Sequence, residues 1–353
     1  DFHSGGIILA HLLKRHPDRL STLAIGGYAI WTDDEMRIFG ERYIPEFHPS
    51  PYGEHLVWLW NRILEQSWFF PWFDVRDETR LSVAHADPER VNAVVMEMLD
   101  AGNAYRFGYR AVLLAKPEVP QRDAVTAPVL ISAYRGDPLC DHIDRMRSMP
   151  ESWQTKKVET PVEHQELSLS FLKEHGQADC PRLAEDDSVG FIAVDEGLIH
   201  WRGTRGAQNM VLHAPGAELT EPQAGELAID VPGHGLSSEC DDYRAAIKAA
   251  RRQLGAEKII WPELPNGEPD ILYPDLTPDR FGGYLSRAWS AARASALFAP
   301  WYAADSDHAI PVEQAALSPE AIALRARALL RAGKAAPKWH HEIALQLQGD
   351  PRI

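Results

Sequence analysis

The residues best suited to nucleophilic chemistry stand in the first stretch of the sequence, DFHSGGIILAHLLKR (1–15). Ser4 precedes two glycines and a run of apolar residues at helical spacing, and a strand-like segment follows at 21–27. A hydroxyl on such a sharp turn stands clear of the backbone, and the first N–H groups of the helix can stabilise an oxyanion. Ser4 is therefore a candidate nucleophile, with the N–H of Gly5 as an oxyanion donor. The alternative interpretation is a serine that caps the helix.

A nucleophilic serine needs a base, and the base needs a carboxylate that orients it. Asp137 follows an apolar, strand-like run in APVLISAYRGDPL (127–139), and His164 lies between a strand and a helix in WQTKKVETPVEHQELSLSFLKEH (153–175). Taken singly, Asp137 is also typical of a turn and His164 of a solvated loop. His3 and His175 are the rival bases, but we expect His3 to point away from the serine and His175 to lie beyond the helix's apolar face.

The order Ser…Asp…His resembles the α/β-hydrolase superfamily, which has a serine elbow, an acid after a late strand and a histidine before the last helix. FHSGG matches G-x-S-x-G at its second glycine, with Phe2 where the first glycine usually stands. The resemblance implies a catalytic triad of Ser4, Asp137 and His164. Relatives that open epoxides use an aspartate at the elbow, so a serine implies attack on an acyl carbon.

A long segment at about 32–116 is rich in large aromatic residues and helical patterns. In the superfamily a helical cap often stands here, over the active site, where it excludes water and shapes the substrate pocket. We expect His3 and four cap residues to line that pocket: Trp60, Trp68, Phe69 and Trp72. The alternative is that these aromatic side chains only pack the cap helices together.

The cap sequence occurs twice. PYGEHLVWLWNRILEQSWFFPWF (51–73) returns as RFGGYLSRAWSAARASALFAPWY (280–302) at an offset of 229, and 87–104 returns as 318–335 at an offset of 231. Such self-similarity at a fixed spacing indicates an internal repeat. The predicted fold class is α/β, with a mostly parallel hydrolase-type sheet and a duplicated helical cap.

The segment before the second cap resembles the front half of the superfamily's sheet. ELAIDVPGHGLSSE (226–239) is similar to its D-x-P-G-H-G-x-S motif, and HAPG (213–216) to its His-Gly pair, which implies Ala214 as a second oxyanion donor. No serine elbow follows the strand at 257–261, so we expect this module to be non-catalytic. We also expect His340, His341 and Glu342 to form a solvated helix surface rather than a metal site.

These motifs predict a first module over 1–183 and a second over 186–353, the latter with its cap at about 270–346, joined by a polar linker at 177–188. The first module starts at its nucleophile, and the chain lacks an initiator Met and a signal peptide, so we expect a piece of something longer. We further expect strands from 190–261 and the elbow block to form one composite sheet that places Ala214 beside Ser4. Two incomplete sheets side by side would also explain the sequence.

Composition narrows the function classes. The 353 residues carry a net charge of −15, which argues against nucleic acid or anionic membranes as partners. Three widely spaced cysteines favour a cytoplasmic location, and no apolar run is long enough to span a membrane. We predict a serine hydrolase of carboxylic esters or thioesters that takes a small hydrophobic acyl substrate, needs no cofactor or metal, and is compatible with a homo-oligomer. The alternative is a degenerate, non-catalytic scaffold that binds a small molecule or a protein.

Overall fold

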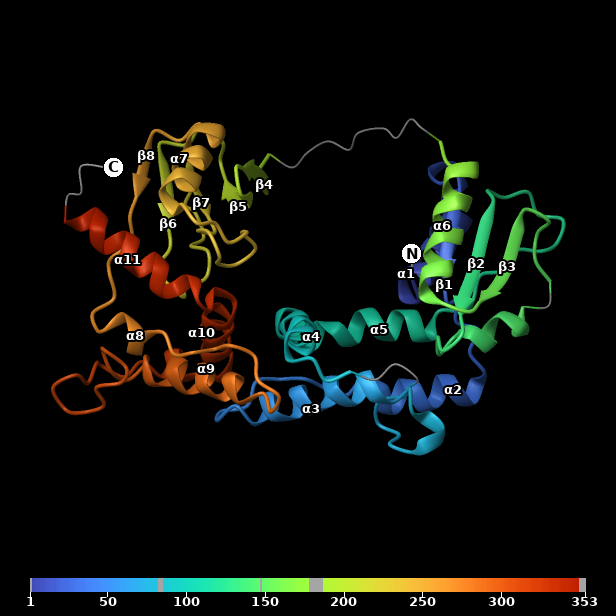
Figure 1. Ribbon diagram of the computed structural model, residues 1–353, viewed down its shortest axis with the longest axis horizontal. Helices are drawn as coiled ribbons and strands as arrows, with labels where there is room; N and C mark the ends of the chain where they lie inside the picture. The colour runs from blue at the N-terminus through green and yellow to red at the C-terminus, as the bar shows by residue number, and fades with distance from the viewer. Residues whose placement is uncertain (1, 82–84, 147, 178–186, 349–353) are drawn as a thin grey trace. The chain divides into compact units, whose positions relative to one another are not determined.

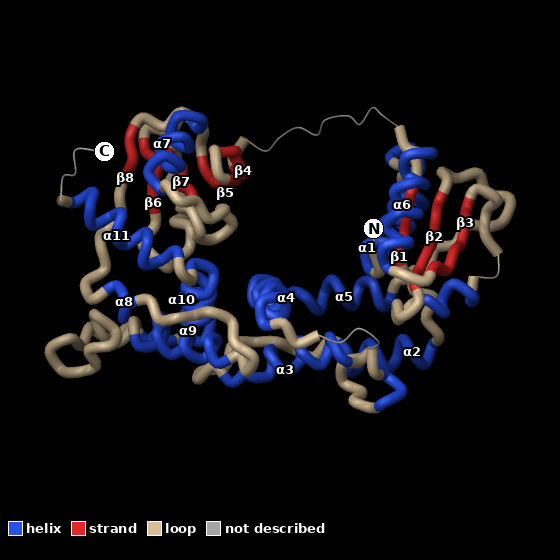
Figure 2. The backbone as a smooth tube through the Cα atoms, viewed as in Figure 1, coloured by secondary structure: helices blue, strands red, loops and turns tan. Residues whose placement is uncertain are grey.

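The computed structural model describes residues 2–81, 85–146, 148–177 and 187–348 of a mixed α/β protein (Figures 1 and 2). The chain divides into two compact units. Unit 1 comprises the described residues of 1–47, 62–86 and 101–182, and unit 2 those of 48–61, 87–100 and 183–353. Most of the expected linker at 177–188, including Cys180, lies outside the described residues.

The sheet of unit 1 has three parallel strands in the order β1-β2-β3. These are β1 (Leu23–Gly26), β2 (Val129–Tyr134) and β3 (Trp153–Val158). Leu23 is opposite Val129, and Val129 is opposite Trp153. Every residue of β1 is buried, as is typical of a parallel strand covered on both faces.

Helices α1 (Ser4–Arg15) and α6 (Pro161–His175) cover the two faces of this sheet (Figure 1). Ile25 of β1 packs with Ile7 of α1 in one hydrophobic cluster, whereas its neighbour Ala24 packs with Phe171 of α6 in another. Alternate strand residues point to opposite faces, so one short strand serves both helices. The sheet thereby fixes the start of α1 and the start of α6 at the same end of the unit.

Helices also account for most of the expected first cap. They are α2 (Asp33–Ile38), α3 (Glu54–Trp68), α4 (Pro88–Ala101) and α5 (Tyr105–Leu114). Thr32 starts α2 with a capping box, in which its hydroxyl accepts the N–H of Glu35 and the Glu35 carboxylate accepts the N–H of Thr32. Glu35 also accepts a hydrogen bond from Arg145 at 2.7 Å, which ties the start of the cap to the segment after β2.

Unit 2 holds a five-stranded sheet in the order β4-β5-β7-β6-β8. Its strands are β4 (Val189–Val194), β5 (Gly197–Gly203), β6 (Asn209–Leu212), β7 (Glu226–Ile229) and β8 (Lys258–Ile260). The pairs β4–β5 and β5–β7 are antiparallel, and β7–β6 and β6–β8 are parallel. The sequence DEG (195–197) between two strand-like segments predicts a hairpin turn, and the first of these pairs confirms it.

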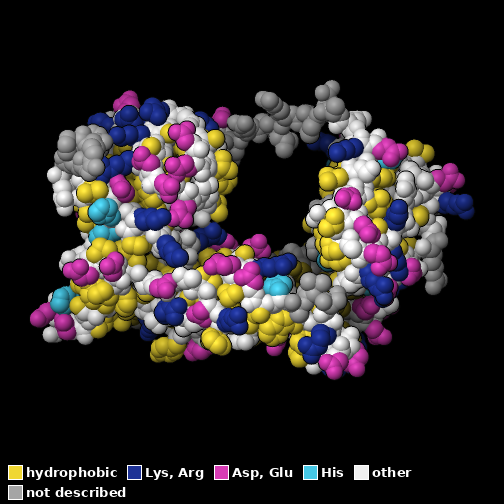
Figure 3. Space-filling view, in the orientation of Figure 1, with side chains coloured by type: hydrophobic (Ala, Val, Ile, Leu, Met, Phe, Trp, Pro, Cys, Tyr) yellow, Lys and Arg dark blue, Asp and Glu magenta, His cyan; other side chains and the backbone are white. Residues whose placement is uncertain are grey.

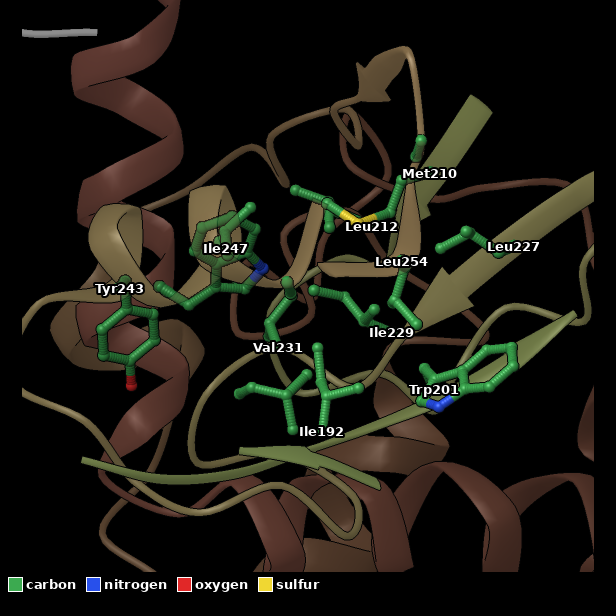
Figure 4. Packing of buried hydrophobic residues seen from close by; sticks show 14 of the residues in the cluster. Ile192, Trp201, Met210, Leu212, Leu227, Ile229, Val231, Tyr243, Ile247 and Leu254 are labelled. Carbon is green, nitrogen blue, oxygen red and sulfur yellow. The ribbon is translucent and has the colours of Figure 1, made fainter. Parts of the chain in front are cut away.

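Five further helices belong to unit 2. They are α7 (Tyr243–Leu254), α8 (Pro269–Leu272), α9 (Gly283–Ala294), α10 (Pro319–Ala332) and α11 (Ala335–Leu347). Asp242 caps α7 by accepting the N–H of Ala245, and Gly255 ends it in the left-handed conformation. Ile247 of this helix and Trp339 of α11 pack with Trp201 and Ile229 of the sheet into one buried core (Figure 4).

The strands do not form the composite sheet expected from the sequence. β1 to β3 pair with one another, β4 to β8 pair with one another, and no described strand joins the two sets. Beside β1, the edge away from β2 is met by a single parallel bridge from Phe2 to Gly26. Periodicity identifies each strand, but strand pairing between distant segments depends on tertiary contacts that a one-dimensional pattern does not contain.

The face displayed in Figure 3 mixes acidic and basic side chains, with hydrophobic residues between them, rather than gathering one sign of charge. Within the described parts of the chain, no helix is both long and apolar enough to cross a bilayer.

Candidate active site in unit 1

The turn into α1 is strained at His3 rather than at Ser4. Among the described residues other than glycine, His3 alone has a positive φ, with φ 46° and ψ −107°. Its N–H donates to the carbonyl of Gly26 at 2.7 Å, Phe2 forms a parallel bridge with the same glycine, and Ser4 is the first residue of the helix. The helix-cap interpretation of Ser4 is wrong, because His3 holds that position. A strained backbone dihedral of this kind is typical of functional sites.

Two glycines at the end of β1 make room for the side chains around this turn. A β-carbon on Gly26 would lie 2.2 Å from the Phe2 ring and 2.8 Å from Nε2 of His164. One on Gly27, which has a φ of +60°, would lie 2.5 Å from the His3 ring and 3.0 Å from a carboxylate oxygen of Asp137. Phe2, His3, Asp137 and His164 therefore converge on a space that exists only because these positions lack side chains.

Asp137 lies in the turn that follows β2 and is 4% exposed. Its Oδ1 accepts the N–H of Leu139 at 2.8 Å and faces Nε2 of His3 at 3.1 Å. The other carboxylate oxygen, Oδ2, is buried and has no hydrogen-bond partner among the described residues. Asp137 thus orients the ring of His3 and keeps an oxygen free for a second donor.

His164 occupies the first turn of α6 and is 8% exposed. Its Nδ1 lies 3.0 Å from the hydroxyl of Ser132, and its ring packs edge-on against Phe2 with centroids 5.6 Å apart. Burial lowers the pKa of His164 below its usual 6.5, and the negative charge of Asp137 partly opposes that shift. The imidazole is therefore neutral at pH 7 and able to accept a proton.

The predicted triad residues gather at one end of the sheet, but their hydrogen bonds differ from the expected set. Asp137 bonds with His3, and His164 bonds with Ser132, so the described contacts do not pair Asp137 with His164. The ring of His3 reaches the buried carboxylate of Asp137, and its expected orientation away from Ser4 stays a prediction. The N–H of Gly5 donates to the carbonyl of Phe2 at 3.2 Å, within the same turn.

A cavity of about 410 Å³ opens beside this cluster. Ser4 and His3 lie in its wall with Ile7, Leu139 and a set of aromatic side chains from the cap: Trp31, Phe39, Tyr43, Phe70 and Tyr109. A small number of polar groups in a mostly apolar pocket is typical of a site for a small organic ligand. The candidate nucleophile and the Asp137-bonded histidine therefore face the same space.

Four aromatic residues expected in the pocket lie elsewhere. The indoles of Trp68 and Trp72 donate to the carbonyls of His85 and Tyr43, and Phe69 is buried at the end of α3. Trp60 is buried within unit 2. The residues that do line the cavity come from the same aromatic-rich segments, and Phe39 and Tyr43 stand four positions apart on one helical turn. That spacing is the signal in the sequence that could have identified them.

Ala214, the expected second oxyanion donor, belongs to unit 2, in the loop that follows β6. Its neighbours are held tightly, because His213 Nε2 accepts the N–H of Val231 and His234 Nε2 accepts the N–H of Gly216, both at 3.1 Å. Asp230 lies 2.8 Å from His200 and accepts the N–H of Leu236. The residues of the D-x-P-G-H-G segment therefore fix loops of unit 2, and the pairing of Ala214 with Ser4 remains a prediction.

Residues suited to metal binding do not gather in the parts of the chain that the structure describes. Cys140 and Cys240 are free thiols. The expectation of a solvated run at 340–342 is wrong in part, because His340 is 5% exposed and its Nδ1 lies 2.9 Å from the hydroxyl of Tyr273. His341 is exposed, as expected.

No protein-family model and no curated protein matches this sequence. Two solved structures are weakly similar to it. Rv0554 from Mycobacterium tuberculosis shares 14% identity with this chain at a TM-score of 0.31. The similar region covers 50% of this chain and 65% of that protein. The Cif epoxide hydrolase from Acinetobacter nosocomialis shares 16% identity at a TM-score of 0.26, over 55% of this chain and 79% of that one. Both proteins differ too much from this chain to assign its site, which rests on the geometry above.

Proposed function

We propose that this chain is a hydrolase of the α/β-hydrolase type that cleaves a carboxylic ester or thioester at the cavity of unit 1. The observation that carries the proposal is the buried carboxylate of Asp137, bonded to a histidine that faces the same cavity as Ser4. A hydroxyl, an imidazole and a buried carboxylate are the groups that acyl transfer through a serine requires.

In the proposed reaction the Ser4 hydroxyl attacks the acyl carbon while a histidine takes its proton. The histidine then returns that proton to the departing alcohol or thiol, which leaves an acyl ester on Ser4. Water, deprotonated by the same histidine, attacks the acyl ester and releases the carboxylic acid and the free serine. The positive end of α1, which begins at Ser4, faces the oxyanion that forms in each attack.

Two histidines compete for the role of base. The sequence assigns it to His164, which is neutral at pH 7 but is oriented by the uncharged hydroxyl of Ser132. The carboxylate of Asp137 favours His3 instead, because a negative partner stabilises the imidazolium that forms during the reaction. We therefore propose that His3 accepts the proton of the Ser4 hydroxyl, with His164 as the alternative base.

Labelling with a fluorophosphonate probe tests the proposal, since the probe reports an activated serine without knowledge of the substrate. The unaltered protein should be labelled, and Ser4→Ala should abolish labelling. Ser170→Ala is the matched control, because that serine lies on the exposed part of α6 and should leave labelling unchanged. Equal labelling of the protein and of Ser4→Ala would exclude Ser4 as the nucleophile.

A second candidate function is a non-catalytic binding site at the same cavity. It is favoured by the backbone of the turn, where the strained position that presents a nucleophile is occupied by a histidine and not by Ser4. A protein of this kind would show no fluorophosphonate labelling, yet short-chain fatty acids or their esters would raise its melting temperature. Substitution of Phe39 by Ala in the cavity wall should remove that rise.

A further inference from the structure

Residues from the two repeated segments, 51–73 and 280–302, contact one another inside unit 2. A tryptophan of each segment packs against a glycine of the other. A β-carbon on Gly53 would lie 2.9 Å from the indole of Trp289. A β-carbon on Gly282 would lie 2.6 Å from the indole of Trp60. Gly282 is 229 positions after Gly53, and Trp289 is 229 positions after Trp60, so the two contacts exchange equivalent residues.

The aromatic pairs at this interface follow the same rule. His55 packs edge-on against Trp289 with centroids 4.9 Å apart and an interplanar angle of 75°. Trp60 packs edge-on against Tyr284 at 5.8 Å and 85°. Tyr284 stands 229 positions after His55, so this is again one contact made twice with the partners exchanged. Both tryptophans are 2% exposed, and both indole N–H groups are buried without a hydrogen-bond partner in the described structure.

A salt bridge joins two equivalent positions directly. Arg331 of α10 pairs with Asp100 of α4, and the offset of 231 between them is the one that relates these two helices in the sequence. In an interface with two-fold symmetry, a residue meets its own equivalent only where it lies next to the axis. Asp100 and Arg331 therefore mark the axis, and the exchanged tryptophan contacts lie to either side of it.

Within each cap the same backbone and indole hydrogen bonds recur at the offset of 229. The N–H of Phe70 donates to Thr79 as that of Ala299 donates to His308, and the N–H of Leu81 donates to Trp68 as that of Ile310 donates to Leu297. The indole of Trp72 donates to the Tyr43 carbonyl, and that of Trp301 to the Leu272 carbonyl. The two segments thus have the same local fold as well as similar sequences.

We propose that the cap is a self-pairing module whose partner is another copy of the same cap. In this chain the second copy is its own C-terminal cap, and the two meet around a pseudo-two-fold axis beside Asp100 and Arg331. Reciprocal contact of equivalent residues is the geometry of a symmetric homodimer, here held within one polypeptide. The pairing stands on packing alone and does not depend on the proposed hydrolase activity.

Double-mutant cycles in the full chain test this pairing. If the caps pair, the effects of two substitutions on stability should be coupled between residues that are distant in sequence but in contact. They should be independent between residues that are near in sequence but not in contact. Gly53→Ala should lower the melting temperature by about 3–8 °C. Part of that loss is the strain of alanine at a φ of +83°, so the loss should shrink measurably but not vanish in the background of Trp289→Ala, which removes the opposing indole. It should persist in full beside Trp60→Ala. The mirror cycle should couple Gly282 with Trp60 and not with Trp289.

Caps that fold separately would give the opposite pattern, with Gly53 coupled to Trp60 seven residues away or to neither tryptophan, and either result overturns the proposal. Should the tryptophan variants fail to fold, exchange of the axial charges decides the matter. Asp100→Arg and Arg331→Asp should each lower the melting temperature, because each brings like charges together. Combining them should recover a measurable part of the summed loss, limited by Arg327, which lies 3.6 Å from Asp100 and would repel an arginine there. A double variant as unstable as the sum of the two contradicts the pairing.

Discussion

Two cavities of about 410 Å³ lie one in each unit, and each is walled in part by one copy of the cap. Tyr43 and Gln66 line the cavity of unit 1, and the residues 229 positions later, Leu272 and Ser295, line the cavity of unit 2. The rest of the walls differ. The first cavity contains His3 and Ser4, whereas the described wall of the second contains no histidine, aspartate or cysteine.

The difference distinguishes the contacts that hold the cap helices together from the residues that we propose take part in the reaction. The second cap segment has its helices, its hydrogen bonds and a cavity, although no carboxylate–histidine pair is found in the described wall of that cavity. Ser295 also lines that cavity, but its hydroxyl donates to the carbonyl of Ala292 at 2.9 Å, and the described lining residues include no histidine. Apolar packing therefore suffices for the helices of unit 2, and the proposed reaction rests on the turn, the glycines and the buried carboxylate that are found in unit 1.

The largest effect should come from the carboxylate that distinguishes the two cavities. Asp137→Asn keeps the shape of the side chain but removes the charge that stabilises an imidazolium, so ester turnover should fall by about 10³–10⁴. Initial rates with a small activated ester measure this loss. Glu218→Gln changes the acidic residue in the wall of the second cavity and should leave the rate within about twofold of normal. Comparable losses of rate in the two variants would contradict the proposal that the reaction takes place in the cavity of unit 1.

Substitution of His3 or His164 should lower the rate less than Asp137→Asn does. The pH dependence of the rate then distinguishes which of the two histidines is the base. If His3 is the base, His3→Gln should cost about 10²–10⁴ in rate, whereas His164→Gln should cost less. If His164 is the base, the rate should rise with pH through a value below 6.5, because burial lowers its pKa, and should already be constant by pH 7. Retention of full activity in both variants would show that neither histidine takes the proton.

Acid should destabilise unit 2 through its buried histidines. Burial lowers the pKa of His234 to about 3 and that of His55 to about 4. The unfolded chain binds protons on these groups from about pH 6.5 downward while the folded chain does not. Stability is therefore present above pH 6.5 and falls as the pH decreases, by up to about 1.4 kcal/mol per pH unit for each group.

Thermal unfolding measured between pH 7 and pH 4 tests this dependence on His234. His234→Gln should flatten the slope, since an amide oxygen can accept the N–H of Gly216 without titrating. His341→Gln, at an exposed position on α11, is the matched control and should leave the slope as it was. An identical slope in all three proteins would mean that His234 is not kept neutral by the fold.

A smaller effect is expected where the cap of unit 1 is tied down. Burial alone would raise the pKa of Glu35, but hydrogen bonds from Arg145 and Thr32 outweigh it and lower the pKa to about 2. The stabilisation is present above about pH 4.5 and is lost as the pH falls toward 2. Glu35→Gln should therefore cost about 1 kcal/mol at pH 7, given its partial exposure, in a urea titration. No change in the unfolding midpoint would show that the ion pair adds nothing.

Local elements could be predicted from the sequence to the extent that short patterns determine them. The apolar run at 129–134 forms β2, and the Asp-Glu-Gly turn at 195–197 joins β4 to β5. The helix expected after His164 begins earlier, at Pro161, so His164 lies in the first turn of α6 and not in the expected loop. The gathering of Asp137 and His164 at one end of a sheet also follows, because both come directly after parallel strands. These features depend on residues close together in the chain.

Three features required tertiary information. The strained position falls on His3 because the hydrogen bond of its N–H to Gly26 fixes where the helix starts, one residue earlier than the G-x-S-x-G alignment suggests. The tryptophan at position 60 serves the other cap rather than the pocket, which only the reciprocal contact with Gly282 reveals. The division of the strands into two sheets depends on pairing partners that the pattern of each strand does not specify.

We propose that hydrolysis takes place in the cavity of unit 1, with Ser4 as the nucleophile. The most direct measurement is fluorophosphonate labelling of the full chain, followed by proteolysis and mass spectrometry to locate the adduct. We expect a single modified peptide that contains Ser4, lost in Ser4→Ala and strongly reduced in Asp137→Asn, with no adduct at Ser295 in the second cavity. An adduct at Ser295, or none on a protein that nevertheless hydrolyses esters, would contradict it.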